Sequence, residues 1–171
     1  MDIHTALVKE HSKAQTIKIT TYIGDDPDRF KKLVETFLAG PYRVTQRAAW
    51  PISVIAEKQP QLIIPHLKKI LNFARKPGVH DSVKRNAVRL LQFIEMPKKL
   101  HGNIADLCFE FLQDKKEPIA VKCFSMTALA TIALSNPELK NELRIILEDQ
   151  LPYASPGFTV RAKRILKQLD N

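Results

Sequence analysis

Acidic side chains gather at one point of the chain where they could bind a metal ion. Asp25, Asp26 and Asp28 surround Pro27, and grouped carboxylates of this kind are ligands in calcium loops. A calcium loop needs more oxygen ligands at wider spacing, whereas an aspartate directly before a proline is typical of a helix start. We therefore expect Asp26 to cap a helix and Asp28 to stabilise its first turn.

The histidines give no stronger indication of chemistry. His4 and His11 are seven residues apart and would share one helix face, but no third metal ligand lies near them in the sequence. His80, Asp81 and Ser82 have the residue types of a catalytic triad, yet neighbours at a helix start fit a capping role better. The five glycines form no phosphate-binding loop. The sequence accordingly predicts no catalytic residue, metal site or cofactor.

The bulk properties fit a chain of 171 residues that forms one domain with a sizeable core. The N-terminus does not show the basic residues followed by an apolar run that are typical of an export signal, so we expect none. The longest apolar stretch, around Ala128–Leu134, is far shorter than the roughly 20 residues of a membrane span. Cys108 and Cys123 fit reduced, buried thiols. We expect a cytoplasmic protein that has no membrane partner.

The net charge of +9 is concentrated in part of the chain. Residues 68–99 contain nine basic side chains and only two acidic ones, and residues 150–171 are also basic. A local positive excess fits an anionic partner, such as nucleic acid or an acidic protein surface. It fits a solvated, lysine-rich helix surface equally well, so charge alone does not decide between these interpretations.

The elements that would position these side chains follow from an internal repeat. Four segments align on Val44, Val83, Val121 and Val160, which are 39, 38 and 39 residues apart. Small or apolar residues recur four, eight and eleven positions after the first three valines, which places them on one helix face. The fourth copy is more polar, as expected at the end of a repeat array. A further amphipathic segment and a turn precede each copy.

This pattern resembles the HEAT-repeat family, an armadillo-type α-solenoid. The shared features are a first helix, a turn with aspartate or proline, and a second helix opening with valine and then lysine or arginine, best seen in residues 80–94 and 112–133. The resemblance implies an all-α, right-handed α-α superhelix with about four helix pairs. The expected organisation is a single domain, 1–171, with an N-terminal capping helix at 3–23 and helix pairs at 27–59, 60–96, 97–136 and 137–171.

In HEAT proteins the second helices line the concave surface, so their outward face is the predicted binding surface. Counted from each valine, this face carries arginine and aromatic residues, including the chain's one tryptophan. Tryptophan and arginine are enriched where proteins bind one another. The predicted partner-binding residues are Arg47, Trp50, Arg85, Arg89, Phe93, Phe124 and Lys163. Pro51 would only bend the helix that carries Trp50.

Two alternatives stay open. The N-terminal segment could cover Trp50 and make it part of the core. The partner could be a protein, which we favour, or DNA or RNA, with arginine on phosphate and the aromatic ring on a base.

A more distant resemblance is to the HEAT-like DNA glycosylases, but these need a catalytic carboxylate in the groove, where only Asp170 is acidic. We therefore predict a non-catalytic interaction protein; its oligomeric state does not follow from the sequence.

Overall fold

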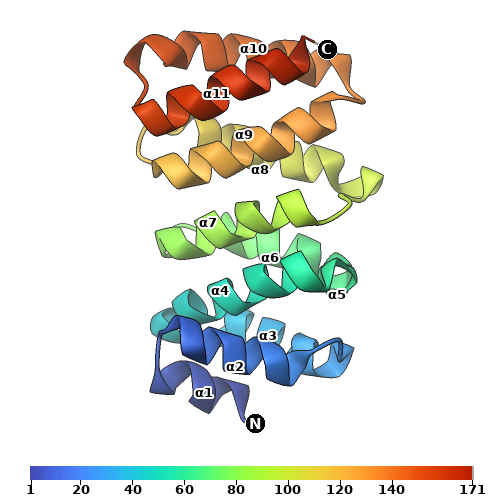
Figure 1. Ribbon diagram of the computed structural model, residues 1–171, viewed down its shortest axis with the longest axis vertical. Coiled ribbons are helices and arrows are strands. Elements are labelled where there is room, and N and C mark those ends of the chain that lie inside the picture. The colour runs from blue at the N-terminus through green and yellow to red at the C-terminus, as the bar shows by residue number, and fades with distance from the viewer. Residues whose placement is uncertain (171) are drawn as a thin grey trace. The chain divides into compact units, whose positions relative to one another are not determined.

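The computed structural model describes residues 1–170, and the regular elements in this range are all helices (Figure 1). This confirms the predicted all-α fold class. The helices group into two compact units, one from Met1 to Glu95 and one from Met96 onward. The division falls within one residue of the boundary between the second and third predicted helix pairs, 60–96 and 97–136. The single domain expected from the sequence stays a prediction.

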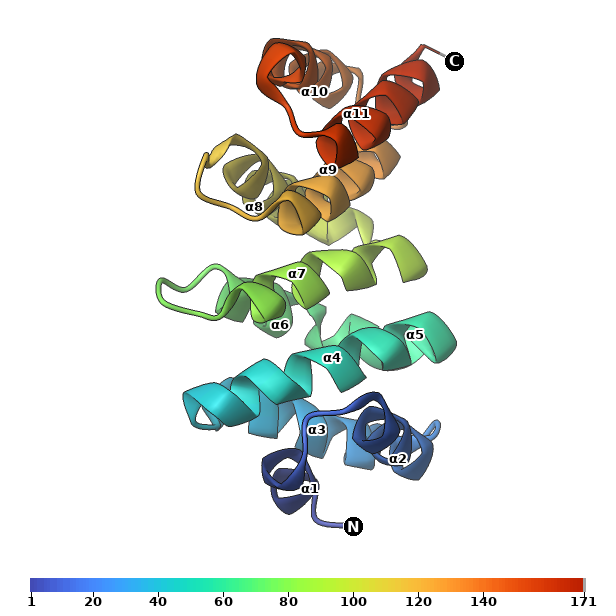
Figure 2. The same ribbon diagram turned by 60° about the vertical axis from the view of Figure 1, so that its left-hand side comes forward.

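The first unit is built from helices that pack in pairs along the chain. Its elements are α1 (Ile3–Lys9), α2 (Lys13–Ile23), α3 (Pro27–Ala39), α4 (Tyr42–Lys58), α5 (Pro60–Ile63), a 3₁₀ turn (Ile64–His66), α6 (Leu67–Ala74), α7 (Asp81–Arg89) and a second 3₁₀ turn (Leu90–Phe93). α4 packs against α3, its partner in the pair, and against α2 and α7 of the neighbouring pairs (Figure 2). α4 is therefore the central helix of this unit.

The N-terminal segment forms two helices, so the prediction of one capping helix over residues 3–23 is wrong. Ser12 ends the continuity, because its hydroxyl accepts the backbone N–H of Gln15 at 3.1 Å and thereby starts α2. The side-chain amide of Gln15 donates to the carbonyl of Ala6 at 2.6 Å and ties α2 to α1. The segment is thus a short helix pair.

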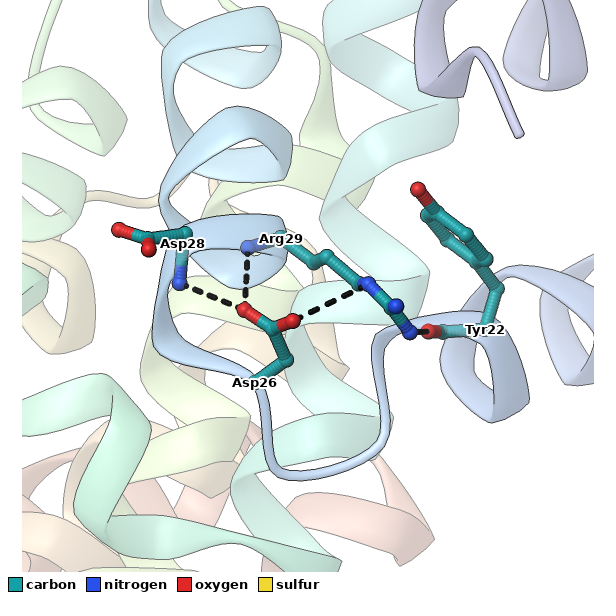
Figure 3. Close-up of polar contacts among 4 residues, drawn as sticks. All are labelled: Tyr22, Asp26, Asp28 and Arg29. Atoms are coloured by element: carbon teal, nitrogen blue, oxygen red, sulfur yellow. Dashed lines mark hydrogen bonds and ion pairs between the residues drawn. The ribbon is translucent and has the colours of Figure 1, made fainter.

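The start of α3 confirms the predicted cap. Asp26 Oδ1 accepts the backbone N–H groups of Asp28 and Arg29 at 2.9 and 3.0 Å (Figure 3). Arg29 completes the arrangement, since its Nε lies 3.1 Å from Asp26 Oδ2 and its Nη1 donates to the carbonyl of Tyr22 at 2.7 Å. The backbone N–H of Arg29 is the main cause that lowers the pKa of Asp26. Nowhere in residues 1–170 do three or more histidine, cysteine or acidic side chains gather as metal ligands would.

The second unit has the same pairwise construction. It begins with a 3₁₀ turn (Lys98–Leu100) and continues with α8 (His101–Gln113), α9 (Ile119–Ala133), α10 (Pro137–Gln150), a 3₁₀ turn (Leu151–Tyr153) and α11 (Pro156–Leu169). α9 packs against α8 of its own pair and against both α10 and α11 (Figure 1). Within residues 1–170, no helix combines the length and the apolar character that crossing a bilayer requires.

The buried face of the second helices follows the predicted positions in three of the four copies. The side chains at the predicted apolar and small positions are all buried in α4, in α7 with the residues that follow it, and in α9. They are Val44, Ala48, Ile52, Ile55, Val83, Ala87, Leu91, Ile94, Val121, Ser125, Leu129 and Ile132. The predicted helical periodicity is thereby confirmed for these copies.

The fourth copy lies in a different register from the one that the valine alignment predicts. Val160 is 72% exposed, whereas Phe158 is buried. The capping residues agree with this shift: His80 caps α7 three residues before Val83, and Ser155 caps α11 three residues before Phe158. Phe158 is therefore the structural equivalent of the repeat valines. The alignment on Val160 is wrong because the start of the helix, and not the residue type, decides which face is buried.

The turns inside the pairs differ in the space that they leave. Gly40 lies in the tight α3–α4 turn, where a Cβ would come within 2.6 Å of the carbonyl oxygen of Thr36. The α6–α7 connection is longer, and its Gly78 has a φ of +76° with nothing within 4 Å of a Cβ. The first turn is thus fixed by packing, whereas the second lies open.

Candidate functional site

Trp50 lies on α4 against the link between α1 and α2. The ring of His11 meets the Trp50 ring edge-on, with centroids 5.8 Å apart and planes at 65°. Trp50 is half-buried and His11 is exposed. The N-terminal segment therefore covers part of the tryptophan ring and leaves part of it accessible, which lies between the two alternatives that the sequence left open.

Arg47 holds the same N-terminal segment in place. Its Nη1 donates to the carbonyl oxygens of Leu7 and Val8 at 2.9 and 2.8 Å. These carbonyls belong to the last turn of α1, where the helix itself offers them no N–H partner. A positive charge at this end of a helix is also favourable. Arg47 thus acts as a cap for α1, a role that the sequence analysis did not anticipate.

Arg89 bridges α7 and α4. Its Nη1 donates to the hydroxyl of Ser53 at 2.6 Å, and its Nη2 lies 3.3 Å from Glu57 Oε2. The guanidinium also lies over the ring of Phe93, 4.9 Å from the centroid. Ser53 is fully buried, whereas the Arg89 side chain is 29% exposed. The guanidinium is therefore fixed in orientation while part of it still reaches solvent.

The contacts of Arg89 with Ser53 and Glu57 connect the outward side chains of α4 with those of α7 and the turn that follows it. Trp50 lies on the same face of α4 as the two residues that Arg89 contacts, because the three are spaced at about one and two helical turns. Arg85 precedes Arg89 by one turn of α7 and is exposed, and Phe93 is half-buried. We call Trp50, Arg85, Arg89 and Phe93 the α4–α7 surface.

The other two predicted residues belong to the second unit, where Phe124 is half-buried on α9 and Lys163 is exposed on α11. A bridge that resembles the one made by Arg89 occurs here as well, since Arg161 Nη1 donates to Thr127 Oγ1 at 2.7 Å. Arg161 was not among the predicted residues, because the predicted register of this copy starts at Val160. Counted from the true start of the repeat, Arg161 occupies the position of Arg47.

Comparison with known families now places the chain. A family model described as the HEAT repeat domain matches residues 3–169. The chain belongs to the HEAT-repeat family. The match includes α1 and α2, so the N-terminal helix pair is part of the region with HEAT-repeat character. No curated protein matches the sequence. HEAT repeats generally mediate protein interactions, and this supports a scaffold role at the level of the family.

The basic stretch of this HEAT-repeat protein does not form a single row of charges. The nine basic residues between 68 and 99 lie on α6, in the α6–α7 loop, on α7 and in the 3₁₀ turn at the start of the second unit. One of them, Arg89, is already engaged by Glu57. The local charge excess seen in the sequence is therefore distributed over several elements.

The second unit also contains a cavity that no sequence pattern indicates. This cavity of about 560 Å³ lies where α8, α9, α10 and α11 meet the turns of their pairs. It combines apolar, basic and acidic side chains. The lining includes Ile119, Lys122, Ile146, Asp149, Tyr153 and Phe158.

Proposed function

We propose that this HEAT-repeat protein is a non-catalytic scaffold that binds a protein partner through the α4–α7 surface. The observation that carries the proposal is the arrangement of Arg89, which is held by Ser53 and Glu57, stacked on Phe93 and still partly exposed. Arginine and aromatic side chains supply much of the energy of protein interfaces. Side chains that are already ordered lose less conformational entropy when a partner binds.

Charge compensation favours a protein over nucleic acid as the partner. Nucleic-acid binding depends on free positive charges that replace counterions on phosphates. At the α4–α7 surface Arg89 is paired with Glu57. Beside it, Arg47 is directed at the carbonyl end of α1. Of the arginines on this face only Arg85 is exposed, and it makes no hydrogen bond or ion pair within residues 1–170. The surface thus presents aromatic rings and guanidinium planes more than net charge.

The test begins with a photo-crosslinking amino acid at Gln92, an exposed position beside Phe93. The same amino acid at Lys32, exposed on α3, is the matched control. A protein captured at Gln92 and not at Lys32 would be identified and purified, and its Kd measured by calorimetry. Arg85→Ala should weaken binding by about fivefold or more, because truncation of an interface arginine that acts as a hot spot costs above about 1 kcal/mol. Lys32→Ala should leave the Kd unchanged.

The second arm tests the nucleic-acid alternative with labelled duplex DNA and a structured RNA, titrated at two salt concentrations. Binding that weakens steeply with salt and quenches the emission of Trp50 would replace the protein proposal. A purified protein partner whose Kd is the same for the wild type and Arg85→Ala would refute the assignment of the surface.

A further inference from the structure

The cavity of the second unit contains a buried lysine. Lys122, on the first turn of α9, is only 8% exposed and lines the cavity. Its ammonium group has no hydrogen bond or ion pair with any residue in the part of the chain that the structure describes. The Lys122 Nζ atom is not fully enclosed by protein, so it reaches the solvent of the cavity. An ammonium that reaches solvent only within the cavity and has no partner is poorly compensated for its lost hydration, and an anion in the cavity would offset that cost.

The α3–α4 pair has a different residue at the equivalent position. The residue after Val44 is Thr45, whose hydroxyl lies 3.1 Å from the carbonyls of both Phe37 and Gly40 and closes the α3–α4 turn. In α9 the residue after Val121 is Lys122. Its longer side chain lines the cavity instead of closing a turn.

A second difference between the repeats is the residue that caps the following helix. In the first unit the capping residue His80 packs edge-on against Tyr42, with ring centroids 5.8 Å apart, and its Nε2 lies 3.2 Å from the side-chain amide of Gln46. The equivalent capping residue of α11 is Ser155, which lines the cavity. A serine leaves free the volume that a histidine ring would occupy, so this small side chain contributes to the open space beside Ile119 and Lys122.

The remaining lining restricts the chemistry of the ligand. Ile119, Ile146 and Phe158 supply apolar walls, and Lys115 adds a second positive charge at the opening. Asp149 lines the same cavity, which disfavours a dianion such as phosphate and favours a single negative charge accompanied by an N–H donor. A volume of about 560 Å³ lies in the usual range of pockets for small ligands.

We propose that this cavity binds a carboxylate that is joined to a bulky apolar group, with the carboxylate on Lys122 and the apolar group among Ile119, Ile146 and Phe158. Two sources share this chemistry: a small organic acid, and the C-terminus of a peptide that ends in an apolar residue. The site uses residues of the second unit alone. It therefore stands or falls independently of the α4–α7 surface.

The test is a titration of the full-length, ¹⁵N-labelled protein with N-acetyl-phenylalanine and with its amide, which differs only in lacking the negative charge. We expect the acid to bind with a Kd of about 1 mM or below, as is usual for a ligand of this size, and to shift the backbone signals of residues 113–122 and 149–158. The amide should bind at least about tenfold more weakly, because it loses a charge-assisted contact. Equal binding of acid and amide, or no binding of the acid, would overturn the proposal.

Three variants assign the effect to the cavity. Lys122→Met keeps an unbranched side chain and should remove the preference for the acid. Ser155→His introduces the residue that caps α7 at the equivalent position, so the helix start is retained while the ring takes up part of the cavity, and both probes should bind more weakly. Lys116→Met changes an exposed lysine of the same turn that does not line the cavity, and it should bind like the wild type. Wild-type affinity of Lys122→Met for the acid would contradict the proposed role of the lysine.

A peptide that ends in phenylalanine distinguishes the two sources. If the peptide with a free C-terminus binds more tightly than N-acetyl-phenylalanine, the natural ligand is the end of a protein chain. Equal affinity of the two supports a small organic acid. Arg85→Ala should bind all these probes like the wild type, which separates this site from the proposed protein-binding surface.

Discussion

Replacing Arg47 with methionine should loosen the attachment of α1 to the rest of the first unit. The change removes the guanidinium and keeps a long apolar stem, so the packing of α4 is preserved. α1 has only seven residues and is too short to be stable as an isolated helix. Its position therefore depends on the burial of Ile3, Ala6 and Leu7 and on the two hydrogen bonds from Arg47.

The size of the effect follows from those two bonds. They measure 2.9 and 2.8 Å and have a charged donor, but one of them is exposed and the other only partly buried. A value of about 1 kcal/mol for each is appropriate for such an environment, which gives about 2 kcal/mol in total. This corresponds to a roughly 30-fold increase in the opening equilibrium of α1.

Hydrogen exchange followed by mass spectrometry would measure this opening directly. Peptides that cover residues 1–12 should exchange roughly 30-fold faster in Arg47→Met, and peptides from α7 should be unchanged, because the opening is local. Trp50 emission should shift to longer wavelength as the ring loses its contact with His11. Arg43→Met, at an exposed position one turn earlier, is the matched control. Equal exchange of residues 1–12 in the two variants would refute the capping role of Arg47.

Three further predictions concern the second unit. Phe158→Ala should lower the free energy of unfolding by about 3–5 kcal/mol and Val160→Ala by less than about 0.5 kcal/mol, measured by urea denaturation; a larger loss for Val160→Ala would restore the valine register. Burial raises the pKa of Cys108 to about 12 from the ordinary 9.0 and also raises the pKa of the half-buried Cys123, so iodoacetamide at pH 8 should label Cys123 first and Cys108 only after unfolding. Because folded Cys108 keeps its proton to higher pH than the unfolded thiol does, the free energy of unfolding should fall as the pH rises from 9 towards 12, and it should fall less in Cys108→Ala.

The repeat could be predicted from the sequence because a helix buries residues at fixed intervals. Val44, Val83 and Val121 each begin such a series, and all three are buried. The rule failed at Val160, where a valine occurs by coincidence at the repeat interval of 39 residues. The serine and proline at 155 and 156 mark the helix start in the sequence, and counting from them would have given the correct register.

The N-terminal break also had a sequence signal. Ser12 and Gln15 have the sequence spacing of a capping box, serine followed three residues later by glutamine, and the Ser12 hydroxyl starts a new helix inside an otherwise continuous amphipathic pattern. The bridging role of Arg89 and the cavity beside Lys122 had none. Both depend on which side chains lie opposite one another in neighbouring helices, and the period of one helix does not contain that information.

The open α6–α7 loop has a practical consequence for studies of this protein in cells. Lys76, Pro77 and Gly78 are exposed, and a side chain at Gly78 would meet no neighbouring atom within 4 Å. Exposed loop tips of this kind tolerate inserted sequence well. An epitope or a small fluorescent reporter inserted here would label the protein internally, and both ends of the chain would stay native.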